Sequence, residues 1–172
     1  MLKALGLAST EQREKYKELK SASNRCQGDI NALKTVTEEL RTAYETHKSD
    51  CALGRYEALK KMVKETGCRY ETVMEKRRKD PNGGSNRRSG ERQEIKAFAV
   101  RASIIARMSR SEMAVELERM NQRLDQLRRQ SGAYRDALEK LNSDYQCSKK
   151  QLPPLRYYVL KDMVKVATRT EP

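Results

Sequence analysis

The chain has 172 residues, of which 35% are charged and 37% hydrophobic; it contains one Phe and no Trp, and its formal net charge is +13. This composition favours one domain of long helices with a narrow buried stripe, rather than a thick globular core or a disordered chain. No apolar run reaches the roughly 18–20 residues that a membrane span needs, and residues 1–8 are too short for a secretory signal, so we expect an intracellular protein, cytoplasmic or nuclear.

The first long helix is predicted over residues 9–80, after an N-terminal segment of residues 1–8. Ser9 and Gln12 have the spacing of a capping box, in which each side chain binds the backbone N–H of the other residue. Asp80 followed by Pro81 is a typical helix end. The main alternative to one continuous helix is a break near residues 51–54, at Gly54.

The second long helix is predicted over residues 91–148, after a basic turn loop at residues 81–90 that is rich in Gly, Asn and Ser. Both helices carry apolar residues at alternating spacings of three and four, the period of a coiled-coil seam. The predicted seam residues are Ile30, Leu33, Thr37, Leu40, Tyr44, His47 and Cys51 on the first helix and Met120, Leu124, Leu127, Ser131, Tyr134, Leu138 and Leu141 on the second. An antiparallel register pairs Ile30 with Leu141 and Leu40 with Ser131, and it shifts phase near the loop.

The C-terminal segment, residues 149–172, is predicted to contain a short docking helix. Leu155, Val159, Met163 and Val166 would share one face of this helix, and Pro154 is tolerated in its first turn. A β-strand over residues 155–167 is the alternative, because the segment is rich in strand-forming residues. The predicted fold class is therefore all-α: a long antiparallel coiled-coil helical hairpin with a short C-terminal docking helix.

Several seam layers are weak, residues 1–22 overhang the end of the second helix, and residues 97–108 hold more apolar side chains than one seam can bury. Excess apolar surface of this kind points to a homo-oligomer or a partner coiled-coil protein. The candidate interface residues are Tyr16, Leu19, Phe98, Val100, Ile104, Ile105, Met108, Tyr158, Val159 and Met163.

Catalytic and metal-binding patterns are not found in the sequence. His47 is the single histidine, and with Cys51 it forms at most half of a Cys–His pair, so we expect a histidine packed in the core. The four cysteines form no CxxC motif, and the Gly-rich loop lacks the phosphate-binding pattern. We expect no enzyme activity, cofactor, metal or small-molecule substrate.

Charge is the most polarised feature of the chain. Residues 76–110, the basic tip of the predicted hairpin, contain eleven basic and three acidic residues. Such a surface attracts polyanions, although basic loops also serve only to keep a protein in solution. The candidate polyanion-binding residues are Lys76, Arg77, Arg78, Lys79, Arg87, Arg88, Arg92, Lys96 and Arg101.

These observations favour a non-enzymatic structural or adaptor protein, a scaffold that assembles through its helices while the basic tip contacts a polyanionic surface. The alternative is a nucleic-acid-binding protein that contacts duplex phosphates without reading sequence, since aromatic residues for stacking on single strands are scarce near the tip. An acidic protein surface, such as a filament or nucleosome, is a third possible partner.

Overall fold

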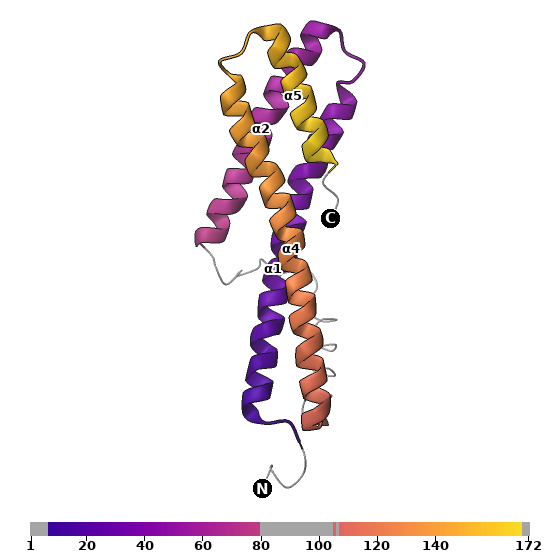
Figure 1. The fold of residues 1–172 in the computed structure, drawn as a ribbon, viewed down its shortest axis with the longest axis vertical. Helices are drawn as coiled ribbons and strands as arrows, with labels where there is room; N and C mark the ends of the chain where they lie inside the picture. Colours follow the sequence, from indigo (N-terminus) through magenta and orange to yellow (C-terminus); the bar gives the residue numbers. More distant parts are fainter. Residues whose placement is uncertain (1–6, 80–104, 106, 170–172) are drawn as a thin grey trace, which may run out of the picture. The chain divides into compact units, whose positions relative to one another are not determined.

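The computed structural model describes residues 7–79, 105 and 107–169, and these are organised as helices (Figure 1). Four helices lie in these ranges: α1 (Thr10–Thr46), α2 (Ala52–Lys79), α4 (Arg110–Ser148) and α5 (Pro153–Thr168). The all-α prediction is confirmed. The chain divides into two compact units. The first unit consists of Met1–Cys26 and Asn82–Leu127, and the second of Gln27–Pro81 and Arg128–Pro172. The predicted loop at residues 81–90 and the start of the second helix at residue 91 lie outside the described residues.

In the first unit, α1 and α4 each begin with a capping box. The predicted box of α1 is confirmed: the Ser9 N–H donates to Gln12 Oε1 at 3.0 Å, and the Gln12 N–H donates to Ser9 Oγ at 3.2 Å. Ser109 and Glu112 repeat this arrangement, with distances of 2.8 Å and 3.3 Å. The backbone N–H and hydroxyl of Ser109 both donate to the Glu112 carboxylate, which lowers the pKa of Glu112. A continuous second helix from residue 91 is therefore wrong, because α4 starts anew after Ser109.

The starts of α1 and α4 lie side by side in this unit. The Ala8 N–H donates to the Met108 carbonyl at 3.0 Å, and Gln12 Nε2 donates to the Arg110 carbonyl at 3.4 Å. A small apolar core fixes the contact; Ala8, Met113 and Leu117 are buried, and Tyr16, Leu19, Ile105 and Met108 pack against them. The expectation that residues 1–22 overhang the second helix without a partner in it is therefore wrong for the described part of this segment.

In the second unit, the first predicted helix is interrupted by a turn at residues 47–51. The continuous helix over residues 9–80 is wrong, and a break close to the predicted one is present. Arg55, one turn into α2, holds this turn: its guanidinium donates to the carbonyl oxygens of Lys48 and Asp50, the latter at 3.2 Å. Ser49 and Asp50 favour such a turn, because their short polar side chains compete with helical backbone hydrogen bonds.

The turn makes α2 run back along α1. Arg77 Nη2 lies 3.1 Å from Asp29 Oδ2, and Arg69 forms an ion pair with Glu39. On its other side α2 meets α4, also antiparallel. A Cβ on Gly67 would lie 3.1 Å from Asn142 Oδ1, and further along α2 the Tyr70 hydroxyl donates to Glu139 Oε1 at 2.7 Å, earlier in α4.

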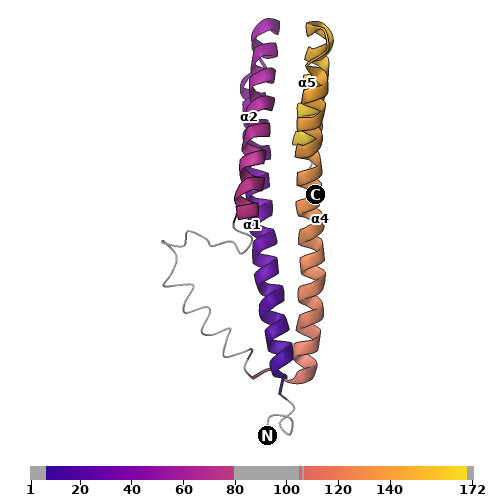
Figure 2. The same cartoon turned by 90° about the vertical axis from the view of Figure 1, so that its left-hand side faces the viewer.

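Because α1 and α4 are both antiparallel to α2 in this unit, they run in the same direction. The predicted antiparallel register between them is therefore wrong. Within the second unit, Figures 1 and 2 show α1 and α2 in one layer and α4 and α5 in the other. A seam pattern indicates which helix face is buried, but it does not indicate which helix covers that face.

Most predicted seam residues are indeed buried in the second unit: Ile30, Leu33, Thr37, Leu40, Ser131, Tyr134, Leu138 and Leu141. Additional buried residues such as Val36 and Met62 widen these faces beyond a two-helix seam, as expected for a helix that contacts two neighbours.

The predicted C-terminal helix is confirmed as a helix, but its buried face differs from the prediction. Leu160, Met163, Val164 and Ala167 are buried in the second unit, whereas Leu155 is 61% exposed and Val166 47% exposed. The helix α5 lies beside α2, where the Tyr157 hydroxyl accepts a hydrogen bond from Arg55 Nη1 at 3.4 Å. No helix among the described residues is sufficiently long and apolar to cross a membrane.

Candidate polyanion-binding site

The last turn of α2 forms the basic cluster that the structure describes. It consists of four consecutive exposed residues, Lys76, Arg77, Arg78 and Lys79, and we call it the basic turn. Cations are favourable at the C-terminal end of a helix, because they face the negative end of the helix dipole. Part of this cluster therefore has a structural role in stabilising α2.

Two of the four cations are paired. Arg77 bridges to Asp29 of α1, and Lys79 Nζ lies 2.6 Å from Glu75 Oε1 on the same helix. Lys76 and Arg78 form no ion pair with any carboxylate among the residues that the structure describes. Counted over the described residues, two positive charges of the basic turn are in excess, more than the roughly half charge of a helix end can offset.

The other predicted polyanion-binding residues, Arg87, Arg88, Arg92, Lys96 and Arg101, lie outside the described residues. Among the described candidates, the structure brings together the four residues of the basic turn. Their side chains are exposed in the last turn of α2, and Arg77 forms an ion pair with Asp29 of the neighbouring helix α1.

The candidate interface residues have different environments. Tyr16, Leu19, Ile105 and Met108 pack against the small core of the first unit. Met163 is buried in the second unit, and Val159 is half-buried. Tyr158 alone among the described candidates is strongly exposed, at 68%. Phe98, Val100 and Ile104 lie outside the described residues.

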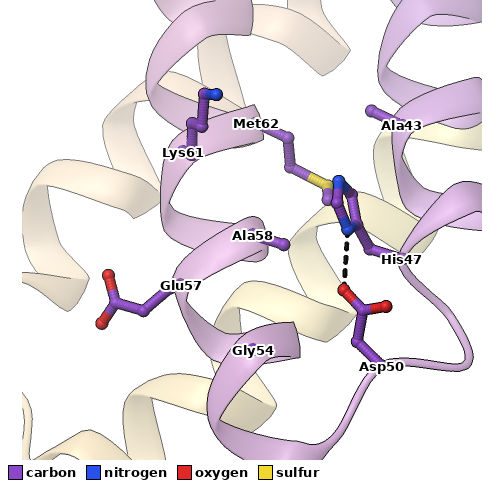
Figure 3. Close-up of a pocket in the computed structure, with 8 residues that line it drawn as sticks. All are labelled: Ala43, His47, Asp50, Gly54, Glu57, Ala58, Lys61 and Met62. Carbon is purple, nitrogen blue, oxygen red and sulfur yellow. Dashed lines mark hydrogen bonds and ion pairs between the residues drawn. The ribbon is translucent and has the colours of Figure 1, made fainter.

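A shallow pocket of about 400 Å³ lies at the turn between α1 and α2 (Figure 3). In this pocket the His47 Nδ1 atom is 2.7 Å from Asp50 Oδ2, and the histidine side chain is 44% exposed. The prediction of a core-packed histidine is wrong, because α1 ends at Thr46 and the seam does not continue through residue 47.

The residues that line the pocket provide few reactive side chains besides His47 and Asp50. A carboxylate that orients an imidazole is part of a hydrolytic triad, but the lining side chains shown in Figure 3 include no hydroxyl or thiol nucleophile. We interpret the His47–Asp50 contact as a hydrogen bond that stabilises the turn. Among the described residues, no group of three or more histidine, cysteine or acidic side chains is arranged to hold a metal ion.

Exposed leucines lie at the start of two helices, where the apolar periodicity of the sequence does not predict them. Leu53 is 73% exposed in the first turn of α2, and Leu152 is 71% exposed at the N-cap of α5, next to the exposed Leu155. A signal was present: a Leu-Pro-Pro-Leu sequence lies within residues 145–161, which hold four basic and no acidic residues.

No protein-family model matches this chain, and neither a curated protein nor a solved structure matches it. The chemistry of its own residues is therefore what indicates its function.

Proposed function

We propose that this chain is a non-enzymatic helical structural or adaptor protein that attaches to a polyanionic surface through the basic turn of α2, and that it assembles with itself or with partner helices. The observation that carries this proposal is the excess positive charge of the basic turn, where Lys76 and Arg78 are exposed and form no ion pair with a described carboxylate.

Duplex nucleic acid is a suitable polyanion for this surface. Lysine and arginine bind phosphates through charge without reading the base sequence, and each neutralised phosphate releases condensed counterions. An acidic protein segment offers a similar array of negative charge, without the regular phosphate spacing of a duplex.

The test is a binding titration of Lys76→Gln/Arg78→Gln with a mixed-sequence DNA duplex and with polyglutamate, each at several salt concentrations. Arg77 is left intact because it holds α2 against α1. We expect weaker binding than wild type to the preferred polymer, and a logarithmic salt slope smaller by roughly 2 for the duplex if two phosphate contacts are lost.

The matched control is Lys64→Gln/Lys140→Gln, which removes the same net charge from two exposed positions on α2 and α4. This variant should bind nearly as wild type does. Equal losses in both variants would show that only net charge matters, and would contradict a site at the basic turn. Failure of wild type to bind either polymer would contradict the proposal as a whole.

A further inference from the structure

The end of the second unit opposite the basic turn has a different surface. Here the turns at residues 47–51 and 149–152 lie together, followed by the first turns of α2 and α5 (Figures 1 and 2). We call this the loop end. The adjacency of α2 and α5 and the hydrogen bond from Arg55 to Tyr157 hold its two halves together.

Apolar side chains project from the loop end. Leu53, Leu152, Leu155 and Tyr158 are each more than 60% exposed. Leu152, Leu155 and Tyr158 follow one another at a spacing of three residues, which places them along neighbouring positions of one side of the α5 start. These exposed side chains lie close together and so form a continuous apolar strip, which we call the apolar edge, rather than isolated surface residues.

Basic residues lie along the α5 part of this edge, in a stretch that Asp144 and Asp162 flank. Residues 145–161 contain Lys149, Lys150, Arg156 and Lys161 and no acidic residue. The buried Tyr145 ring has Lys149 Nζ at 5.3 Å and Arg156 Cζ at 5.6 Å from its centroid, which keeps these two cations at the loop end. The surface therefore combines exposed leucines with cations that are held beside them.

The backbone at the start of α5 also suits an apolar environment. A helix normally begins with several unpaired N–H groups that need water or a polar cap. Here Pro153 and Pro154 have no N–H, and the N-cap is Leu152, which provides no side-chain cap. Few backbone N–H groups would therefore lack a partner if this helix end left water, and an unpaired backbone N–H group is costly in lipid.

We propose that the loop end docks on an anionic lipid membrane, with Leu152 and Leu155 inserted at the boundary between head groups and acyl chains. Lys149, Lys150 and Arg156 bind the lipid phosphates, and Tyr158 lies at head-group level, where aromatic rings with a polar end are favoured. This inference goes beyond the proposed function, since it uses the other end of α2 and a lipid rather than a polymeric ligand.

The first experiment measures binding to vesicles of phosphatidylcholine with and without phosphatidylserine by sedimentation. We expect binding that depends on phosphatidylserine. Leu155→Ser should weaken partitioning about tenfold, because one inserted leucine is lost. Its matched control is Val115→Ser, which removes another exposed aliphatic side chain, 70% exposed, in the first unit and should bind as wild type does.

The charge arm compares Lys149→Gln/Lys150→Gln with Lys64→Gln/Lys140→Gln, which have equal net charge. The first should weaken binding to phosphatidylserine vesicles about tenfold or more, and the second should have a small effect. The Leu155→Ser variant should keep wild-type binding to the DNA duplex or polyglutamate, so this inference and the proposed function can fail separately.

The second experiment uses the absence of Trp from the chain. Leu155→Trp provides a single fluorescent reporter at the loop end, and Val115→Trp provides the matched control. With phosphatidylserine vesicles, emission of Leu155→Trp should shift to the blue and be quenched by lipids brominated on their acyl chains, whereas Val115→Trp should not change.

Three results would overturn the proposal. The first is that wild type does not bind phosphatidylserine vesicles. The second is that the tryptophan of Leu155→Trp stays in water on vesicles that bind the protein. The third is that Leu155→Ser leaves vesicle binding unchanged but lowers the mass of the protein in solution. That result would assign the leucines to contact with a second copy of the chain.

Discussion

At the scale of single residues, the most informative side chain is Tyr70, which connects α2 to α4 inside the second unit. The residue is 6% exposed, and its hydroxyl donates to the Glu139 carboxylate at 2.7 Å. Burial of the phenol is the largest cause of its raised pKa, followed by the hydrogen bond to Glu139 and the negative charge of that residue. All three disfavour the phenolate.

We therefore predict that Tyr70→Phe lowers the free energy of unfolding by about 1 kcal/mol at neutral pH, through loss of one hydrogen bond to a charged group that is partly in water. The folded state holds the Tyr70 proton more tightly than the unfolded state does. The stabilisation from Tyr70 is thus complete below the ordinary tyrosine pKa of about 10 and is lost as pH rises above it.

Urea unfolding followed by circular dichroism at pH 7 and near pH 10.5 measures this difference. The other tyrosines are common to wild type and variant, so the change in the difference with pH reports Tyr70. A variant that is as stable as wild type at pH 7, or a difference that grows at high pH, would contradict the role assigned to this hydrogen bond.

At the scale of elements, apolar spacing predicted which faces of the helices are buried, because burial of one face is what the period records. Ile30, Leu33 and Leu138 are examples. The direction of pairing could not be predicted in this way, since the same seam fits either orientation of a partner helix. The turn that reverses the chain is held by Arg55, which binds the carbonyl groups of that turn, and this contact has no periodic signature.

The candidate binding surfaces, like the helix pairing, could be predicted from the sequence only in part. The basic turn was identified because four consecutive cations are visible in the sequence. The exposure of Leu152 and Leu155 was not, because an apolar residue in a short amphipathic segment is normally assigned to its buried face. Which face of α5 is buried depends on the helices beside it, and the sequence alone did not reveal those neighbours.

Substitution of the glycines within helices by alanine tests how closely the helices pack. Gly28 and Gly132 have no neighbouring atom within 4 Å of an added Cβ, whereas a Cβ on Gly67 would lie 3.1 Å from Asn142 Oδ1 on α4. We predict that Gly28→Ala and Gly132→Ala each raise the free energy of unfolding by up to about 1 kcal/mol, because alanine favours the helix.

Gly67→Ala should gain less than these two or lose stability, because Asn142, which also hydrogen-bonds Glu71 at 3.3 Å, must move. The test is the urea concentration at the unfolding midpoint of each variant, compared when the dependence of unfolding free energy on urea concentration is the same in all three. Equal stabilisation by all three substitutions would show that α2 and α4 do not approach closely at Gly67.

At the scale of the molecule, both proposed surfaces depend on the turn that separates α1 from α2. The turn creates the loop end, with its exposed leucines, and brings Asp29 of α1 against Arg77 in the basic turn. A continuous helix through residues 47–51 would remove the loop end and separate Asp29 from the basic turn. The reversal of the chain at this turn is therefore the central structural claim.

The most direct test is the distance between spin labels at positions 39 and 69, in a protein whose four native cysteines are replaced by serine and which is diluted with unlabelled protein. Glu39 and Arg69 form an ion pair across the two helices, so labels on adjacent helix axes about 8–10 Å apart should report a separation of roughly 10–20 Å. These positions are 30 residues apart. A continuous helix would place them about 45 Å apart, and a distribution centred there would contradict the fold and both surfaces built on it.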